Sequence, residues 1–439
     1  MQYLRVDVYG AGLRQLVVQP VFGEGRRVVP RAGKGTGALH TGAAECYSIL
    51  RFRMAAALSL EGAGGKCFSS WRKGEDAEME RTTVGYDKLR HYMQRMFVVG
   101  LKYPEESAEI TARVLVEADA RGHASHGVAR VSMYAAEVWD GKNVPQAKPE
   151  IVHETPVSLV IQGNRAPGFP VSRTAMERTL EKAEENGTCM TVVRDSCHFG
   201  MAGYWAEQAA DRGMIGWAFT NTLGAAIPLF GRERLLGTNP ISVAIPTGRK
   251  PHFMLDMATT TVAFGKIEVA ARRGGTMPTG WAVDGTGTDT TDAVTVADTG
   301  RGNKSPYGGL LFLGGATETL GGHKGYGLGL LVELLTSGLS MGTASFDTYG
   351  DGCGICHCFQ AMRMDLFGDA GAVQRHVAGI LDRIRSSPRA EGQERIYIHG
   401  EKEFERREKA LKEGIWLDPA TWRRLDEYAD KFGVERLEP

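Results

Sequence analysis

Four short β-rich segments in the middle of the chain constrain its fold most strongly. Each is bounded by residues typical of turns, and they read TCMTVVRDS, MIGWAFTNT, NPISVAIPT and HFMLDMATT. A helical pattern, MAGYWAEQAADRG, separates the first two, and GYGLGLLVELLTSGLS follows the last after a long Gly/Thr/Asp loop at residues 284–309. Because this last segment is apolar nearly all round, we expect it to form a buried helix. Many of the 57 glycines lie in short turns between apolar runs, as an α/β fold requires.

Further helices are predicted on both sides of this region. In YPEESAEITARVLVEADARG, Pro104 suits the first turn of a helix and Gly122 suits its end. A second helix is expected over about residues 126–139, with Ser125 as its N-cap and Gly141 just past its end. Two charged surface helices are expected near the C-terminus, in EKEFERREKALKEG and DPATWRRLDEYADKFG.

Composition and charge narrow the class of protein. At 439 residues, of which 42% are hydrophobic and 24% charged, the chain is expected to form two or three packed domains. Its 52 basic residues balance 52 acidic ones, which gives no electrostatic reason to expect nucleic acid or an anionic membrane as a partner. No apolar run reaches the roughly 18–20 residues that span a bilayer. Seven scattered cysteines are typical of a reducing compartment, so we expect a cytoplasmic protein.

Residues 1–82 show no sustained periodicity, and we interpret them as a poorly ordered extension. Two glycine-rich motifs within them fail as nucleotide sites. The GAG at residues 10–12 lacks the third glycine of a dinucleotide fingerprint, because Gln15 takes its place. Further on, in RAGKGTG, Lys34 is followed by glycine, where a phosphate loop needs serine or threonine.

The segment GHASHGVAR, residues 122–130, gathers an acid/base group, a hydroxyl and a fixed cation. On a helix, residues four apart share a face, so His126, Arg130 and Tyr134 would form one polar stripe. Arg130 could hold a carboxylate in a two-point grip, and His126 could then exchange a proton with the neighbouring oxygen. The alternative is that Ser125 is only a helix cap and that the histidines lie on the surface.

Other polar segments follow strands or open helices. His198 lies in the loop between VVRDS and a helix, a setting in which side chains often reach into clefts. Asn221–Thr222 and Asp256–Thr260 each close a β-rich segment and offer donors and acceptors that suit a ribose or a phosphate. GGHKGYG at residues 321–327 opens a helix and could cradle a phosphate. His123 is interpreted as a surface residue.

The motif CGICHC at residues 353–358 admits three interpretations. C-x-x-C-H is the pattern of c-type haem attachment, and the cysteines together with His357 could also bind a metal. No export signal accompanies the motif, and no second C-x-x-C pair supplies further ligands. We therefore expect buried thiols here and no metal site.

Several of these segments occur, in order, in one known family. A resemblance to the malate/L-lactate dehydrogenase family, of the non-Rossmann type, is carried by EADARGHASHGVAR, VVRDSCHFGMAGYWAEQA, LGTNPISVAIP, FMLDMATTTVAFGKI, PTGWAVD and GGHKGYGLGLLVELLTSGLS. It implies a homodimeric oxidoreductase that uses NAD or NADP. It also implies an α/β fold in which a mostly antiparallel central sheet binds the cofactor and helical segments from both chain ends complete the substrate side.

The same resemblance divides the chain after the extension into three parts. Residues 83–160 would form a helical segment for substrate binding and dimer contact, and residues 161–324 would bind NAD or NADP. Residues 325–439 would form a C-terminal helical segment that completes the substrate and dimer domain.

Site residues are also implied by the resemblance. The family's Ser-His pair falls on Ser125 and His126, and its substrate-binding arginine falls on Arg130. The histidine of its HFG motif falls on His198. Cofactor contacts are implied for Thr222, Asp256, Met257, Ala258, His323, Lys324, Gly325, His399, Gly400 and Glu401. Three features depart from the family pattern: His399 stands where the family has proline, the loop at 284–309 is longer, and CGICHC stands where the family reads Asn-Ile-Gly-His.

The implied reaction is reversible hydride transfer between a nicotinamide and a small 2-oxo or 2-hydroxy carboxylic acid. Arg130 would bind the carboxylate, and His126 would act as the general acid or base. Ser125 would orient His126 or bond the substrate oxygen. His198 would polarise the carbonyl group or take over the proton, and the sequence does not separate these two roles. A cyclic-imine reductase of the same fold and a non-catalytic relative are the alternatives.

Overall fold

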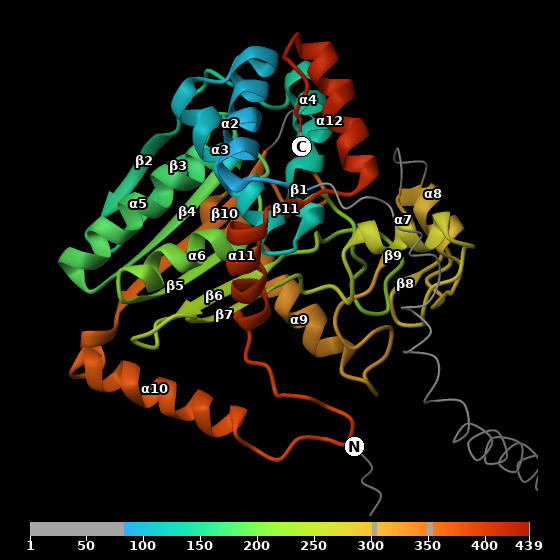
Figure 1. The fold of residues 1–439 in the computed structure, drawn as a ribbon. Helices are drawn as coiled ribbons and strands as arrows, with labels where there is room; N and C mark the ends of the chain where they lie inside the picture. The colour runs from blue at the N-terminus through green and yellow to red at the C-terminus, as the bar shows by residue number, and fades with distance from the viewer. Residues whose placement is uncertain (1–82, 301–304, 349–353, 439) are drawn as a thin grey trace, which may run out of the picture. The chain divides into compact units, whose positions relative to one another are not determined.

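The computed structural model describes residues 83–300, 305–348 and 354–438 (Figure 1). Residues 1–82, interpreted above as an extension, lie outside these ranges, and so does Cys353 of the CGICHC motif. None of the helices in the described ranges combines the length and the hydropathy needed to cross a membrane.

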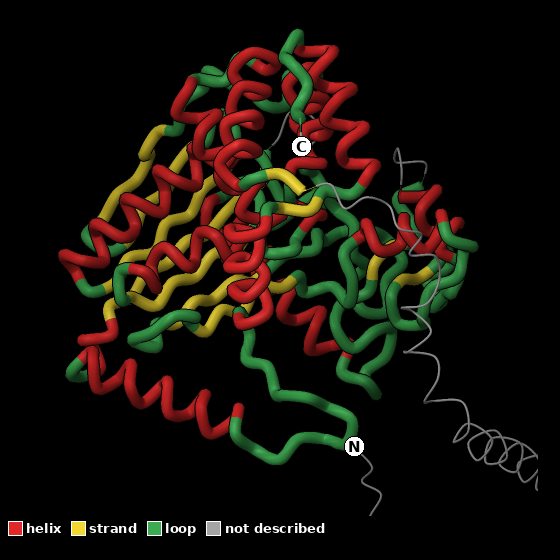
Figure 2. The backbone as a smooth tube through the Cα atoms, viewed as in Figure 1, coloured by secondary structure: helices red, strands yellow, loops and turns green. Residues whose placement is uncertain are grey.

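A seven-stranded sheet organises the described residues, in the order β2-β3-β4-β10-β5-β6-β7 (Figure 2). Neighbouring strands pair antiparallel, except for β3 and β4, which run parallel. This confirms the predicted α/β fold with a mostly antiparallel central sheet. The strands span Glu150–Thr155 (β2), Ser158–Gln162 (β3), Thr188–Ser196 (β4), Met214–Thr220 (β5), Ile241–Ile245 (β6), Phe253–Met257 (β7) and Ile355–Arg363 (β10). The four β-rich segments of the sequence are β4, β5, β6 and β7.

Helices cover both faces of the sheet. Successive residues of a strand point to opposite sides, and in β10 the apolar side chains of both sides pack against helices. On one face, Phe359 of β10 packs into the same core as Phe169 and Trp205, which come from α5 and α6. On the other face, Cys358 packs with Val332 of α9. The helices span Tyr86–Arg95 (α2), Glu105–Ala120 (α3), Val131–Trp139 (α4), Gly168–Asn186 (α5), Ala202–Asp211 (α6), Phe264–Arg272 (α7), Ala293–Gly300 (α8), Gly322–Glu333 (α9), Ala370–Arg385 (α10), Glu401–Glu413 (α11) and Pro419–Phe432 (α12).

Segments from the two ends of the described chain lie together, as Figure 1 shows for α2, α3, α11 and α12. Thr83–Val84 (β1) pairs antiparallel with Ile415–Trp416 (β11). Below this pair, the buried carboxylate of Glu117 in α3 forms ion pairs with Arg121 at 2.9 Å and with Arg407 of α11. A buried charge is stable only when it is paired and hydrogen-bonded, so this cluster fixes α11 against the end of α3. One further short antiparallel pairing joins Ala282–Val283 (β8) to Gly309–Leu310 (β9).

The prediction of a helix over residues 126–139 is wrong for its first part. Residues 124–126 and 128–130 form two short 3₁₀ turns, and α4 begins only at Val131. Gly127 joins the two turns with φ −90° and ψ −161°, an extended conformation that a continuous helix does not allow. Ser125 therefore lies inside the first turn and is not the N-cap of a helix.

The segment at residues 284–309 is not one continuous loop either, because it contains α8. Asp292 precedes this helix, and its carboxylate accepts a hydrogen bond of 3.1 Å from the backbone N–H of Thr295. The hydroxyl of Thr295 donates a second bond of 2.6 Å to the same carboxylate. The aspartate and threonine residues that suggested a loop are thus also the residues that cap a short helix.

The prediction that α9 is a buried helix is wrong for one of its sides. Val332 is completely buried against the sheet, but Leu328, Leu331 and Leu334 are 37%, 49% and 57% exposed. Leu339 and Met341, which follow in the next turns, are 52% and 81% exposed. The apolar composition predicted burial correctly for the side of the helix that packs on the sheet. The opposite side is also apolar, but no part of the described chain covers it.

Candidate active site

Two loops bring His126 and His198 face to face. His126 ends the first 3₁₀ turn after α3, and His198 lies in the loop between β4 and α6. Their rings are stacked, with centroids 5.7 Å apart and an angle of 21° between the ring planes. Residues that are 72 positions apart in the sequence (126 and 198) therefore share one site.

The ring of His198 is held from behind. Its Nδ1 lies 2.7 Å from the hydroxyl of Tyr134, on α4, and accepts a hydrogen bond of 3.3 Å from the backbone N–H of Gly200. Burial lowers the pKa of His198 well below its usual range, and the electrostatic effects of the neighbouring His126 and Arg130 lower it further. His198 is therefore neutral at pH 7. The hydrogen bond to Tyr134 was not apparent from the sequence, which placed Tyr134 only on a stripe with His126 and Arg130.

His126 is held more loosely. Its Nδ1 lies 3.0 Å from the hydroxyl of Ser125, which can donate or accept a hydrogen bond. Burial lowers its pKa to about 4, and the charge of Arg130 contributes to the shift. Both histidines of the site are thus neutral at physiological pH, and the pKa of His126 is sensitive to whatever neutralises Arg130.

Arg130 stands at the entrance to α4, beside the two rings. Its Nε donates a hydrogen bond of 2.5 Å to the carbonyl oxygen of Ser125, and its Nη1 lies 3.6 Å from the sulfur of Met133. The Nε contact ties the guanidinium to the turn that carries His126. Nη1 and Nη2 remain at the tip, and they are the pair of donors that an end-on carboxylate would need.

Asp119, in the last turn of α3, supports this turn from beneath and was missed by the sequence reasoning. Its Oδ2 accepts a hydrogen bond of 2.7 Å from the backbone N–H of Val128. A Cβ atom at Gly127 would lie 2.0 Å from Oδ1 of the same carboxylate, so only glycine fits between the two 3₁₀ turns. Burial raises the pKa of Asp119 to about 7. No spacing rule marks an aspartate nine positions before the amide that it binds, so the sequence offered no signal for it.

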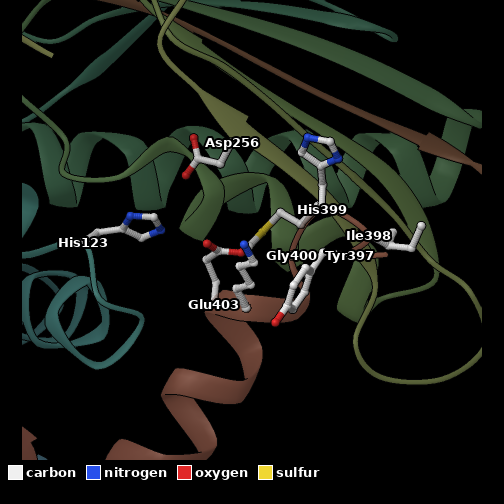
Figure 3. A pocket seen from close by; sticks show the side chains of 9 residues that line it. His123, Asp256, Tyr397, Ile398, His399, Gly400 and Glu403 are labelled. Carbon is white, nitrogen blue, oxygen red and sulfur yellow. The ribbon is translucent and has the colours of Figure 1, made fainter. Parts of the chain in front are cut away.

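A cavity of about 280 Å³ borders the turn that carries His126, because His123, directly before that turn, is part of its lining (Figure 3). It is bounded by the turn after α3, by β7 and by the start of α11, and its lining includes His123, Asp256, His399, Gly400, Lys402 and Glu403. The structure thus brings together Asp256, His399 and Gly400, three of the residues expected at the cofactor. His123, expected to be only a surface residue, lines the cavity as well, and its side chain points toward Asp256.

Asp256 supplies a half-buried carboxylate to this cavity. Its Oδ2 accepts a hydrogen bond of 2.8 Å from the backbone N–H of Gly203, and a Cβ at that glycine would lie 2.5 Å from the same oxygen. Burial raises the pKa of Asp256, and the neighbouring charge of His123 opposes the rise. Among the described residues, Asp256 accepts a hydrogen bond through Oδ2 alone, which leaves Oδ1 for a hydroxyl donor such as a ribose.

The remaining residues expected at the cofactor lie elsewhere or have other partners. Thr222 uses its hydroxyl to accept a hydrogen bond of 2.9 Å from the N–H of Thr238, and it does not line the cavity. Glu401 forms ion pairs with Arg385 at 2.7 Å and Arg395 at 3.2 Å, and it stabilises the loop before α11. Five further residues also lie outside the lining of the cavity, at the end of β7 and in the first turn of α9: Met257, Ala258, His323, Lys324 and Gly325.

The CGICHC motif is part of a central strand. Cys356 and Cys358 lie in β10 as completely buried free thiols, and burial raises their pKa values to about 11 and about 12. His357, on the opposite face of the strand, stacks on Phe199 with ring centroids 4.5 Å apart. Buried thiols were expected for these two cysteines, and the structure confirms that part of the prediction.

Comparison with known proteins gives one consistent result. A family model described as malate/L-lactate dehydrogenase matches residues 84–426. The malate dehydrogenase of Pyrococcus horikoshii is 40% identical over 357 residues, which cover 81% of this chain and 96% of that protein. The L-sulfolactate dehydrogenase of Methanocaldococcus jannaschii is 38% identical and covers 75% of this chain and 92% of its own length.

Solved structures show the same likeness. The structure of the malate dehydrogenase from Pyrococcus horikoshii matches with a TM-score of 0.73 at 37% identity, and the match covers 81% of this chain and 97% of that one. The Δ1-piperideine-2-carboxylate reductase from Pseudomonas syringae matches with a TM-score of 0.69 at 26% identity, covering 79% of this chain and 100% of the other. The fold is therefore similar to those of a malate dehydrogenase and of a piperideine-2-carboxylate reductase.

Proposed function

The chain belongs to the malate/L-lactate dehydrogenase family, and from that premise we propose that it interconverts a small 2-oxo acid and its 2-hydroxy acid by hydride transfer with NAD or NADP. Its relatives are 2-hydroxy acid dehydrogenases, and so is this chain. The observation that carries the proposal is the stacked pair of His126 and His198 with Arg130 beside it. An acid/base group and a carboxylate-binding cation in one site are what this reaction needs.

The substrate is proposed to bind by its carboxylate. The Nη1 and Nη2 atoms of Arg130 would hold the two carboxylate oxygens, which places the adjacent C2 oxygen near the two histidines. The carboxylate would also neutralise the charge that helps to lower the pKa of His126. Binding of substrate therefore raises that pKa toward its ordinary value, and His126 can then deliver a proton to the C2 oxygen during reduction and recover it during oxidation.

The residues around the adjacent cavity fit part of a dinucleotide. Asp256 can accept a hydrogen bond from a ribose hydroxyl through Oδ1, and Gly400 stands at the N-terminus of α11, where free N–H groups favour a phosphate. Gly400 has φ 94°, and a Cβ there would lie 3.1 Å from Met254, so the tight approach of this loop to β7 depends on glycine. When bound, the nicotinamide supplies or accepts the hydride.

The oxidative reaction is predicted to persist at low pH. A general base must be neutral, and burial places the pKa of His126 at about 4 in the free enzyme. The kcat/KM for a 2-hydroxy acid, which reports on the free enzyme, should therefore stay level as pH falls from 7 to 5 and decline only below about pH 4. Initial rates in buffers of constant ionic strength check this, and a decline centred near pH 6.5 would contradict the assignment of His126 as the base.

The activity is tested by a substrate panel. Oxidation of NADH and of NADPH is followed by absorbance with oxaloacetate, pyruvate, a ureido acid derived from glyoxylate, a diketo sugar acid and a cyclic imino acid. Oxaloacetate is the first substrate to test, because two relatives that are 39% to 40% identical are malate dehydrogenases. Turnover confined to the imino acid would favour the imine-reductase alternative, and failure to bind either cofactor would remove the proposal.

We also propose that the chain acts as a homodimer. The apolar side of α9 and the following turn, formed by Leu328, Leu331, Leu334, Leu339 and Met341, is exposed in one copy. An exposed apolar patch of this kind marks an interface, and a second copy of the same chain is the partner that the family resemblance implies.

This dimer makes a specific prediction. Leu331→Glu places a charge in the apolar side of α9 and should convert the dimer to a monomer, which size-exclusion chromatography with light scattering measures directly. Leu411→Glu is the matched control, because Leu411 is 44% exposed on the charged helix α11. A wild-type chain that is monomeric at micromolar concentration, or a Leu331→Glu variant that remains dimeric, would contradict the proposal.

We propose that the protein is located in the cytoplasm, because its described cysteines are free thiols. The four cysteines within the described ranges, Cys189, Cys197, Cys356 and Cys358, are all free and buried. Free thiols are typical of proteins in a reducing compartment. Fractionation of the source cells with an antibody against the chain would test this proposal.

A further inference from the structure

The hydrogen bonds behind His198 determine which of its nitrogens carries the proton. A backbone N–H can only donate, so the contact of 3.3 Å from Gly200 favours Nδ1 of His198 as an acceptor, although a bond of this length is too weak to hold that form alone. The hydroxyl of Tyr134, 2.7 Å from the same atom, then also acts as a donor. A neutral imidazole with an accepting Nδ1 carries its proton on Nε2.

Both donors are held in place by their surroundings. Tyr134 is 1% exposed, and its ring packs against Phe97 at 6.0 Å and edge-on against Phe169 at 5.4 Å. Burial raises the pKa of Tyr134 well above its usual range, so its hydroxyl keeps the proton that it donates. Gly200 has φ 80°, and a Cβ there would lie 2.7 Å from Val114, so the orientation of its amide depends on glycine.

The front of the ring faces the site. Among the described residues, no hydrogen bond engages Nε2 of His198, while the His126 ring stacks beside it. A proton on Nε2 can be shared with a carbonyl oxygen as a hydrogen bond. The same proton prevents Nε2 from acting as a base, because a base needs a bare nitrogen there. Full transfer from a neutral ring would leave an imidazolate, which is too basic to form in this site.

The protonation form of His126, unlike that of His198, is not fixed by its neighbours. Its Nδ1 faces the hydroxyl of Ser125, which rotates and can either donate or accept. Both neutral tautomers and the protonated ring are therefore compatible with its surroundings. During reduction, the hydride bonds to C2, the C2–O double bond becomes single, and the oxygen takes one proton from protonated His126. Neutral His126 takes up a proton from solvent again when the next oxo acid binds and its carboxylate neutralises Arg130.

We propose that Tyr134 is a positioning residue that holds His198 in the form protonated on Nε2, so that His198 polarises the substrate carbonyl and His126 alone transfers the proton. The proposal rests on the proposed function for its kinetic consequence, but the protonation form of His198 does not depend on any substrate. It separates the roles of two histidines that the sequence left interchangeable.

The test compares Tyr134→Phe with wild type by two independent measurements. The variant removes one hydroxyl and keeps the ring that packs against Phe97 and Phe169. In chain labelled with ¹⁵N-histidine, long-range ¹H–¹⁵N correlation spectra distinguish a bare ring nitrogen from a protonated one, and the signal that disappears in His198→Gln assigns His198 among the 11 histidines. We expect His198 to be protonated on Nε2 in wild type and to show exchange between the two forms in Tyr134→Phe.

Kinetics supply the second measurement. Loss of one hydrogen bond to the ring should lower kcat for reduction of the oxo acid by about 5- to 10-fold, with KM for the acid and for the cofactor unchanged. Tyr103→Phe is the matched control, because Tyr103 is also buried and its hydroxyl accepts a hydrogen bond of 3.0 Å from Asn143, while among the described residues it bonds to neither histidine. It should lose similar stability and keep its kcat.

A further variant separates polarisation from proton transfer. In His198→Gln, the side-chain N–H can still donate a hydrogen bond but cannot exchange a proton, so this variant should retain more activity than His126→Gln. Equal losses in the two variants would overturn the division of roles. A wild-type spectrum that shows His198 protonated on Nδ1 would overturn the role of Tyr134, even if the chain turns over no substrate. Absence of turnover with the expected spectrum would instead count against the proposed function.

Discussion

Replacing His126 with glutamine is expected to lower kcat for reduction of the oxo acid by about 10²–10⁴-fold, the usual contribution of a positioned acid or base. Glutamine is close to histidine in size and keeps a hydrogen-bonding group, so the turn that Asp119 and Arg130 hold should remain in place. The measurement is steady-state oxidation of the reduced cofactor under saturating oxo acid. Binding of the cofactor should be unchanged, because His126 does not line the adjacent cavity.

The control for this variant is His153→Gln. His153 is an exposed histidine of β2, at the edge of the sheet away from the two site loops, and its replacement should leave kcat unaltered. Thermal unfolding of both variants tells a catalytic loss from a folding defect. A His126→Gln enzyme with turnover near wild type would remove His126 from the reaction and would leave His198 as the group that exchanges the proton.

The strands show where the sequence predicted the fold and where it failed. β4, β5, β6 and β7 were recognised because runs of apolar and β-branched residues lie between turn residues. β10 was not recognised, although it pairs with both β4 and β5. Its cysteines and His357 suggested ligands, whereas the fold buries them in a strand. His357 is tolerated there because its Nδ1 lies 2.8 Å from the hydroxyl of Thr220 and its ring stacks on Phe199.

The candidate site was predictable only within single segments. The grouping of Ser125, His126 and Arg130 is visible because the three lie within six positions of each other. Their expected helix was wrong, since Gly127 and the Asp119 carboxylate break it into two turns. Spacing in sequence carries no information about contacts between distant segments, so the bond from Tyr134 to His198 became visible only in the fold.

α9 shows a different limit of sequence reasoning. An apolar pattern indicates that a surface is covered but does not identify what covers it. A helix packed between its own sheet and a second chain has the same apolar composition as a helix buried within one chain. The sequence therefore misidentified what covers Leu331 and Leu334, which are exposed in one chain. In the proposed dimer, the second chain would bury them.

Arg130→Lys is expected to raise KM for the oxo acid by about 10- to 100-fold, because it removes charge-assisted hydrogen bonds of about 1.5–3 kcal/mol. The single ammonium of lysine keeps the charge but cannot bind the carbonyl oxygen of Ser125 and two carboxylate oxygens at once, as the Nε, Nη1 and Nη2 atoms of arginine can. Loss of the bond to Ser125 also loosens the turn that carries His126, so kcat should fall by a smaller factor.

Initial rates over a range of oxo-acid concentrations measure this effect, with the cofactor saturating. Arg178→Lys is the matched control, since Arg178 forms ion pairs with Glu154 and Glu181 on the exposed side of α5 and should tolerate the change. KM for the cofactor should stay constant in both variants, because neither arginine lines the cavity. An unchanged KM for the oxo acid in Arg130→Lys would show that the substrate carboxylate binds elsewhere, and the only role left for Arg130 would be to hold the Ser125–His126 turn.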